Sequence, residues 1–274
     1  MQKELIDGNT SFELPQAIAK MMDNEKVSDK YRLVTKYYSV RPDTGPYKKM
    51  IYLAYDSEST VAFHYGHTEI EYFERVWQPE LIIVFGKQAQ AYYKRHGYDT
   101  YLLNLGYDDM NHKELPHTNE FDLGFVGTID KIRWSDFYVR HLVLQTLGNL
   151  NLFKITCGSE FYNKIPEVYS NCLVGYNDVL RLSPNMRFFE IPENGAYMLI
   201  NDTVRDFIKK YKYPLKENKH YTVFNNIADM AEKLKWMIDN KDEVNARAQE
   251  AKQLILKQPL SAEVRKMVDK YGMR

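Results

Sequence analysis

The sequence predicts an α/β protein with two Rossmann-like, doubly wound domains that face each other across a cleft, and with helices at its C-terminus. Two observations lead to this fold class. Short apolar runs alternate with helical stretches from Tyr31 onward, which is typical of βα units and parallel sheets. A polar segment without hydrophobic periodicity, Met110–Glu120, interrupts this alternation and indicates an interdomain linker. We therefore expect an N-terminal domain over residues 1–118 and a C-terminal domain over residues 119–274.

The first domain is expected to hold few and short elements. A continuous apolar run such as Leu81–Phe85 favours a buried strand, and Gly97 stops the helix that follows it. An amphipathic segment around Leu14–Met22 precedes the first strand. The expected strands are Lys30–Val40, Met50–Tyr55, Leu81–Phe85 and Thr100–Leu105, and the expected helices are Glu69–Trp77 and Gln88–His96.

The second domain repeats the alternation and then ends in helices. Pro259 separates the last two helices, since a proline is not tolerated in a helix interior. The expected strands are Leu123–Gly127, Leu152–Cys157, Cys172–Val174, Tyr197–Ile200 and Thr222–Phe224. The expected helical segments are Asp136–Leu147, Pro166–Tyr169, one at Glu190, Thr203–Lys210, Ile227–Asn240, Glu243–Lys257 and Ala262–Tyr271.

Composition sets few limits on function. Lys plus Arg and Asp plus Glu both total 37 in 274 residues, so the net charge is zero, which argues against a protein that coats polyanions. An apolar fraction of 44% suffices for a buried core, and no apolar run reaches the ~18–20 residues that span a bilayer. We expect Cys157 and Cys172 to be buried, reduced thiols on neighbouring strands, with a disulfide or metal pair as the alternative. Together with a start that lacks a signal-peptide pattern, this indicates a cytoplasmic location.

The segment Ser183–Asp202 is the most informative part of the chain. It places Asn185, Arg187 and Glu190 ahead of Gly195 and a short apolar strand. As a loop, a helix N-terminus and a parallel strand, it brings a cation, a carboxylate and free backbone N–H groups to one sheet edge. Such groups bind phosphate, and a glutamate one turn further in can accept hydrogen bonds from ribose hydroxyls. The alternative is a helix packed on a sheet with ordinary surface charges.

The pattern N-x-R-x-F-E from Asn185 to Glu190, followed by a small-residue turn and an apolar strand, resembles the donor-site segment of GT-B glycosyltransferases. It is most similar to the spore-maturation-protein-B-like (CgeB-like) group, which is related to the family-4 retaining enzymes. The run Phe121–Thr128 followed by Arg133 is similar to the opening of the second domain in that group. Leu102–Asp108 and the helix-rich tail Asn225–Tyr271 extend the resemblance to roughly residues 50–271.

This resemblance implies a glycosyltransferase that moves a sugar from a nucleotide diphosphate sugar, expected to be a UDP-sugar, to a hydroxyl acceptor. The acceptor is a protein, a glycan or a modified nucleobase, and neither a metal ion nor another cofactor is expected. The short first domain departs from the family, so the alternative is an inactive sugar-nucleotide or glycan-binding module of the same fold. A nucleotide-binding oxidoreductase is excluded because no G-x-G-x-x-G follows a predicted strand.

The resemblance also assigns roles on the donor side. Arg133 is expected to stabilise the leaving diphosphate, with Lys131 as a competitor, and Glu190 to hold the ribose. The first glutamate of the family-4 E-x7-E motif is absent, since Leu182 stands in its place. Arg187 contacts phosphate or pairs with Glu190, and Asn185 caps the helix or contacts the donor. The other donor-binding candidates are Gly127, Thr128, Tyr176, Asn177 and Gly195.

On the acceptor side, Asp56 ends a predicted strand and is the candidate base or orienting group for an acceptor hydroxyl. The catalytic candidates are therefore Asp56, Arg133 and Glu190. His64 and His67 are further acceptor-side candidates. Their i,i+3 spacing suits a metal, but no third ligand is evident, so we expect histidines that line the cleft or the surface.

Overall fold

The computed structural model describes residues 13–28, 31–34, 49–54, 71, 78–127, 129, 131, 138–158, 165–179 and 185–274. The chain forms two compact units. The first joins residues 1–110 to residues 260–274, and the second holds residues 111–259. The expected boundary at residues 118 and 119 therefore lies eight residues beyond the observed one, and the last helix belongs to the first unit rather than the second.

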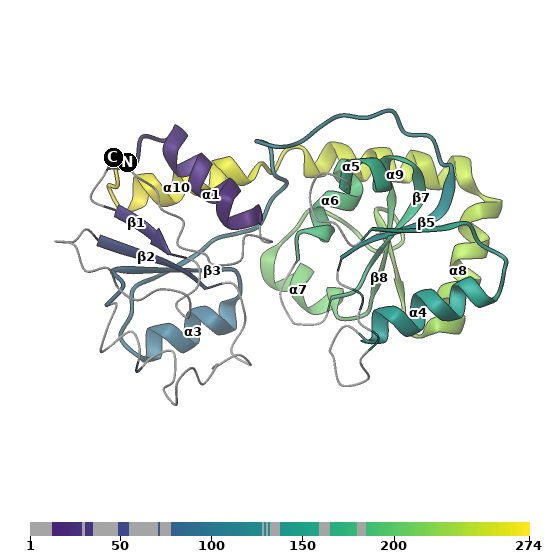
Figure 1. Ribbon diagram of the computed structural model, residues 1–274, viewed down its shortest axis with the longest axis horizontal. Helices are drawn as coiled ribbons and strands as arrows, with labels where there is room; N and C mark the ends of the chain where they lie inside the picture. Colours follow the sequence, from purple (N-terminus) through teal and green to yellow (C-terminus); the bar gives the residue numbers. More distant parts are fainter. Residues whose placement is uncertain are drawn as a thin grey trace. The chain divides into compact units, whose positions relative to one another are not determined.

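The described part of the first unit contains a four-stranded parallel sheet. Its strands β1 (Tyr31–Val34), β2 (Lys49–Ala54), β3 (Leu81–Val84) and β4 (Thr100–Leu102) lie in the order β1-β2-β3-β4. Its helices are α1 (Glu13–Asn24), α3 (Lys87–Arg95) and α10 (Leu260–Lys270). Helices α1 and α10 lie on one face of this sheet and α3 on the other (Figure 1).

The position of α10 follows from its apolar face. Four side chains of α10 are fully buried: Leu260, Val264, Met267 and Val268. They belong to the same unit as the buried face of α1, which presents Ala17, Ile18, Met21 and Met22. Ion pairs from Arg265 and Arg274 to Glu25, both at 2.8 Å, tie the C-terminus to the turn after α1. Burial of its apolar face thus places α10 in the first unit. The order of elements along the chain does not reveal this.

The second unit contains a five-stranded parallel sheet in its described residues. The strands are β5 (Phe121–Val126), β6 (Ile155–Gly158), β7 (Cys172–Asn177), β8 (Tyr197–Asn201) and β9 (Tyr221–Phe224), in the order β6-β5-β7-β8-β9. The chain first moves from β5 outward to β6 and then reverses across β5 to β7. This reversal is a topological switch point, and open α/β sheets bind ligands beside the carboxyl ends of the strands at such a point.

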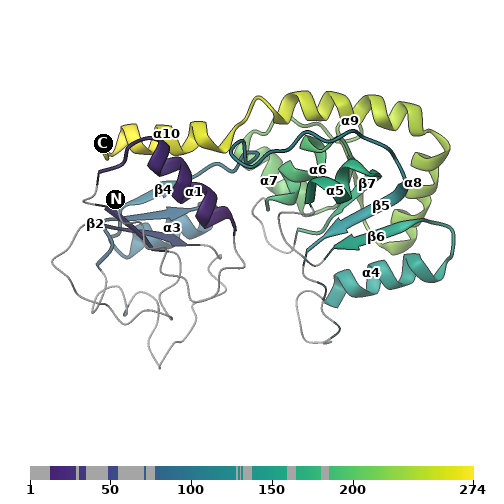
Figure 2. The same cartoon turned by 45° about the horizontal axis from the view of Figure 1, so that its top comes forward.

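Helices cover both faces of this sheet. They are α4 (Tyr138–Asn149), α5 (Ile165–Ser170), α6 (Arg187–Glu193), α7 (Val204–Tyr211), α8 (Ile227–Asp239) and α9 (Lys241–Ile255). Helices α5, α6 and α9 lie on the face opposite α4 (Figure 2). A Cβ at Gly175 would clash with Ile191, so the missing side chain lets α6 lie directly on β7. The expected strands and helices of this unit are confirmed, with ends that differ by a few residues.

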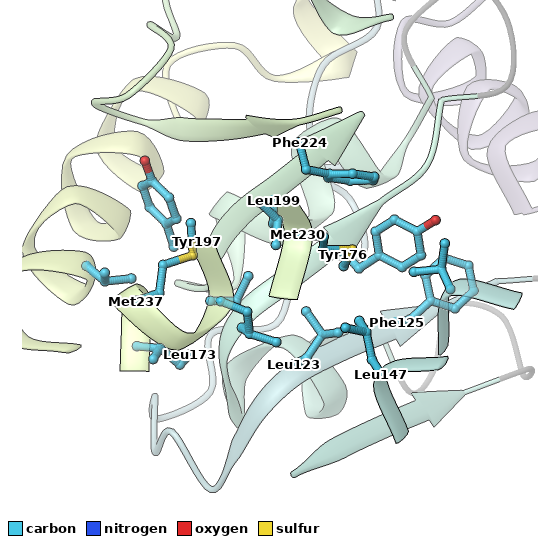
Figure 3. Packing of buried hydrophobic residues seen from close by; sticks show 14 of the residues in the cluster. Leu123, Phe125, Leu147, Leu173, Tyr176, Tyr197, Leu199, Phe224, Met230 and Met237 are labelled. Atoms are coloured by element: carbon cyan, nitrogen blue, oxygen red, sulfur yellow. The ribbon is translucent and has the colours of Figure 1, made fainter. Parts of the chain in front are cut away.

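The main hydrophobic cluster of the second unit joins the sheet to helices α4 and α8 and includes Val244 and Ala248 of α9. Side chains from β5, β7, β8 and β9 interlock there with α4 and α8 (Figure 3). The largest contributors are fully or almost fully buried, including Phe125, Tyr176, Tyr197, Leu147 and Met230. This packing holds the carboxyl ends of β5 and β7 at fixed positions.

The two cysteines are free thiols, as expected, but the exposure of Cys157 and the placement of the two strands differ from expectation. Cys157 on β6 is exposed and Cys172 on β7 is buried, and both are free thiols. Their strands are not neighbours, because β5 lies between β6 and β7. The linear sequence suggested adjacency because β7 is the next strand after β6, whereas the chain reversal separates them.

Candidate functional site

Polar side chains gather at the carboxyl edge of the second sheet. Gly127 follows β5, Asn177 ends β7 and is followed by Asp178, and Asn201 ends β8. Helix α6 begins at the same edge with Arg187, after Asn185. The candidate site therefore lies at the switch point between β5 and β7, where the fold predicts a ligand.

Arg187 lies across the end of β5. Its Nη1 donates a hydrogen bond to the main-chain oxygen of Val126 at 3.0 Å, and its guanidinium carbon lies 5.1 Å from the ring centre of Phe125. Its Nε is buried and has no hydrogen-bond partner among the described atoms. An unsatisfied buried donor is costly. The Val126 carbonyl and the Phe125 ring thus hold the guanidinium in place, while its buried Nε stays unsatisfied among the described atoms.

Gly127 makes this position possible. Its φ of +149° lies in a region that side chains rarely adopt, and a Cβ there would clash with Nη1 of Arg187. The expected role of Gly127, close approach of the backbone to another group, agrees with this geometry. The group that approaches it in the structure is a guanidinium.

Asn185 caps α6 and fixes the end of β7. Its Oδ1 accepts from the N–H of Phe188 at 3.2 Å, which confirms the expected capping role. Its Nδ2 donates to Oδ1 of Asn177 at 2.9 Å and to the main-chain oxygen of Asp178 at 3.3 Å. Asn177 is fully buried. The two asparagines therefore join the start of α6 to the end of β7.

Glu190 lies one helical turn into α6 and is 9% exposed. Among the described ion pairs there is none between Glu190 and Arg187, and the guanidinium of Arg187 instead contacts Val126 and Phe125. Both charges act on the buried hydroxyl of Tyr169, whose pKa is raised mainly by burial and is lowered in part by Arg187. The i,i+3 pairing that would make Arg187 a helix-surface residue is therefore wrong, while Glu190 stays close to the site.

Sequence reasoning missed a buried ion pair at this edge. Arg140, in the first turn of α4, and Asp178 are each 4% exposed. Nε of Arg140 donates to Oδ2 of Asp178 at 3.1 Å, and Nη2 donates to its main-chain oxygen at 3.3 Å. Nδ2 of Asn201 donates to Oδ1 of the same carboxylate at 3.1 Å. Burial and the nearby Arg187 lower the pKa of Arg140 to about 10, so it remains a cation at neutral pH.

Tyr176 is buried directly beside the site, against the Phe125 ring that Arg187 contacts, whereas Gly195 lies elsewhere. Tyr176 is a core residue, whose ring lies 5.2 Å from that of Phe125 and 5.8 Å from that of Phe224, centre to centre (Figure 3). Burial raises the pKa of its hydroxyl. Gly195 follows the C-terminus of α6 with a φ of +88° and precedes β8, so it lies at the amino edge of the sheet beside His117. Its conformation ends a helix, and it is not part of the site.

The remaining expected residues lie outside the described part of the chain. These are Thr128 and Arg133 on the donor side and Asp56, His64 and His67 on the acceptor side. Within the described ranges, no group of three or more His, Cys, Asp or Glu side chains is arranged to hold a metal ion. No helix in those ranges has the length and apolar character needed to cross a membrane.

The arrangement suits an anionic ligand rich in oxygen. Two guanidiniums, Arg140 and Arg187, approach the same Phe125 ring, at 5.8 and 5.1 Å from its centre. The carboxylate of Asp178 is the counter-ion of Arg140 among the described residues. Guanidinium donors and amide groups recognise phosphate and hydroxyl oxygens well. The guanidinium of Arg187 and the amide groups of this edge therefore suit an oxygen-rich anion such as a phosphate.

Comparison with known proteins agrees with this chemistry. The model of a family described as glycosyl transferase-like matches residues 111–266, which is more than half of the chain. No curated protein matches the chain at a significant level of sequence similarity.

Solved structures share the fold at low sequence identity. HepE from Anabaena, solved with UDP and glucose, is 10% identical with a TM-score of 0.58, and the match covers 96% of this chain and 84% of that one. Sucrose-phosphate synthase from Thermosynechococcus elongatus is 12% identical with a TM-score of 0.54, over 95% and 77%. The pneumococcal O-GlcNAc transferase GtfA, solved with UDP and GlcNAc, is 11% identical with a TM-score of 0.55, over 93% and 59%.

These likenesses concern the fold, which is the α/β fold of GT-B glycosyltransferases with parallel sheets and flanking helices. The chain spans 59% of the matched chain in the GtfA/B complex and 57% of TarM.

Proposed function

Because the chain belongs to the glycosyl transferase-like family, we propose that it transfers a sugar from a UDP-sugar to a hydroxyl acceptor. The position of Arg187 supports this most directly. At the switch point its guanidinium packs against Gly127 and donates a hydrogen bond to the Val126 carbonyl. The choice of UDP rests on the fold neighbours solved with UDP and a sugar.

The transfer needs charge relief on the leaving group. The bond between the anomeric carbon and the diphosphate oxygen breaks, and its electron pair leaves with the diphosphate. A new bond forms from the anomeric carbon to the acceptor oxygen, whose proton passes to a base. Fixed cations aimed at the diphosphate stabilise the charge that develops there.

In this proposal Arg187 binds the diphosphate through its guanidinium. Glu190 accepts hydrogen bonds from the ribose hydroxyls, and Asn177 and Asn185 line the same edge. Arg133 adds a second cation on the leaving group, and Asp56 is the base for the acceptor hydroxyl, with His64 and His67 on the acceptor side. Gly127 and Thr128 follow β5, where the donor approaches the backbone.

Three finer points belong to the same proposal. The anomeric configuration is retained, which rests on the resemblance to family-4 enzymes and the CgeB-like group. The reaction needs no metal ion, because arginines neutralise the diphosphate. The acceptor is a protein, a glycan or a modified nucleobase.

Thermal denaturation with added nucleotides tests the proposal. UDP should raise the melting temperature in the presence of excess EDTA, because a ligand that binds only the folded state stabilises it, by ~2.7 kcal/mol at 100 times its Kd. Arg187→Met should weaken UDP binding by ~1–3 kcal/mol, the cost of losing a charged hydrogen bond. UDP-sugar should also be hydrolysed slowly without an acceptor and with EDTA present.

Each arm has an outcome that contradicts part of the proposal. If UDP, GDP, ADP and TDP all leave the melting temperature unchanged, the donor assignment is wrong. If UDP binds but no UDP-sugar is ever hydrolysed or transferred, the chain is a binding module. If hydrolysis stops with EDTA and returns with Mn²⁺ or Mg²⁺, metal independence is wrong.

A further inference from the structure

Asp178 connects four elements at the carboxyl edge of the second sheet. Its carboxylate binds Arg140 of α4 through Oδ2 and Asn201 of β8 through Oδ1, both at 3.1 Å. Its main-chain oxygen accepts from Arg140 and from Asn185, both at 3.3 Å. Asp178 itself follows β7. One residue thus fixes the ends of β7 and β8, the start of α4 and the loop before α6.

Stability alone does not account for this pair. Desolvation of two buried charges often exceeds their attraction, and apolar residues of similar volume frequently stabilise as well or better. Burial and the like charge of Arg187 lower the pKa of Arg140, whereas the charge and hydrogen bond of Asp178 raise it. In some proteins a buried pair of this kind fixes one particular geometry.

The geometry that it sets is that of Arg187. Asn185, held by the main chain of Asp178, caps α6 through the N–H of Phe188, next to Arg187. The guanidiniums of Arg140 and Arg187 also contact the same fully buried Phe125 ring. Arg140 is therefore connected to Arg187 through the Asp178–Asn185 bonds and through Phe125.

We propose that Arg140 and Asp178 form a positioning pair that holds Arg187 in the orientation that binds the donor diphosphate, without contacting the donor themselves. This inference rests on the proposed function of Arg187. It differs from a purely structural role because the effect of Arg140 on UDP binding must pass through Arg187.

A double-mutant cycle on the full chain tests this connection, with UDP as the probe. Arg140→Met should raise the Kd for UDP about 10-fold when Arg187 is present. In an Arg187→Ala background the same substitution should change Kd less than about 2-fold, because the group that it positions is gone. The measurement is titration calorimetry at a temperature where circular dichroism shows each variant to be folded.

Matched controls separate positioning from general destabilisation. Arg205→Met removes an exposed arginine that pairs with Glu217 in the same unit and should leave the Kd for UDP unchanged. Arg140→Lys reaches one carboxylate oxygen but cannot also bind the Asp178 main chain, so it should give a smaller loss that again disappears without Arg187. If Arg140→Met does not fold, Arg140→Lys takes its place in the cycle.

Two results would overturn the inference, and they differ in what they say about the function. In the first result, wild-type protein binds UDP, but substitution of Arg140 either leaves Kd unchanged or raises it by the same factor with and without Arg187. The positioning role is then wrong, while the proposed donor site is unaffected. If wild-type protein does not bind UDP, the proposed function fails and the inference fails with it.

Discussion

Gly127 and Arg187 occupy one small space at the end of β5. A Cβ at Gly127 would meet Nη1 of Arg187, which is the mobile end of a long side chain and can move away. Movement would break its hydrogen bond to the Val126 carbonyl. Backbone strain adds a cost, because the φ of +149° at Gly127 is unfavourable for alanine.

Gly127→Ala should therefore lower UDP affinity about 10-fold and destabilise the fold by ~1–3 kcal/mol, the usual cost of a strained backbone position. The measurements are titration with UDP and urea unfolding. Gly148→Ala is the matched control, because nothing lies within 4 Å of a Cβ there and alanine is the better helix former, by ~0.5–1 kcal/mol. If the Gly127→Ala variant binds UDP as tightly as the wild type, Gly127 is not part of the UDP site.

Residues that follow a strand or begin a helix were predictable from sequence. Gly127, Asn177, Asn185 and Arg187 lie together because apolar runs mark the strand ends that bring them to one edge. Arg140 was not predictable, because an arginine near a helix start has the pattern of a solvated charge. Only the fold shows that it is buried against Asp178.

Gly195 is the opposite case, a residue that the sequence suggested for the site and that the structure places away from it. It lies close in sequence to Arg187, which suggested a shared site. The seven residues of α6 advance the chain by ~1.5 Å each, so Gly195 lies about 10 Å further along, toward the other edge of the sheet. Sequence proximity across a short helix therefore does not place two residues at one site.

At the scale of elements, the segment from residue 111 to residue 120 is irregular, as the sequence predicts, but it is bound to the second unit. Nδ1 of His112 lies 3.3 Å from Oε1 of Glu193 at the end of α6. Lys252 of α9 pairs with Glu114 at 3.1 Å, and the N–H of Thr118 donates to Ser170 at 3.0 Å. Polar composition predicted the absence of regular structure, whereas these attachments depend on tertiary contacts.

The His112–Glu193 pair should make the stability of the second unit depend on pH. The hydrogen bond that His112 donates to the Glu193 carboxylate raises the pKa of His112 above its ordinary value, although burial opposes this. A histidine whose pKa is higher in the folded protein than in the unfolded chain stabilises the fold. This stabilisation is complete at pH values below the pKa of the unfolded chain, about 6.5, and is lost as the pH rises through the pKa of the folded protein. The pair therefore stabilises the fold under mildly acidic conditions and less under alkaline ones.

Urea unfolding of His112→Gln, Glu193→Gln and the double variant checks this prediction. The coupling between the two positions should be about 1 kcal/mol at pH 5.5, as for a charged hydrogen bond in a partly exposed site, and clearly smaller at pH 9. A coupling that stays constant or grows between these pH values would contradict a protonated His112 in the pair.

At the scale of the whole molecule, the glycosyl transferase-like match and the second unit begin at the same residue, Asn111. All the described residues of the candidate site lie within this unit. The unit ends at Pro259, and α10 beyond it contributes its apolar face to the first unit. The order of elements along the chain suggested a second domain that runs to the C-terminus, because the sequence does not show which partner buries a terminal helix.

A fragment of residues 111–259 should therefore fold, remain monomeric and bind UDP with a Kd within about 10-fold of the full chain. A fragment of residues 111–274 should be less soluble, because α10 would expose Leu260, Val264, Met267 and Val268 without α1, and each such side chain gains ~1.5–3 kcal/mol from burial. Circular dichroism, sedimentation and UDP titration compare the two fragments. If residues 111–259 fold but do not bind UDP while the full chain does, the donor site needs residues of the first unit. If the longer fragment is the more stable and soluble one, α10 belongs with the second unit after all.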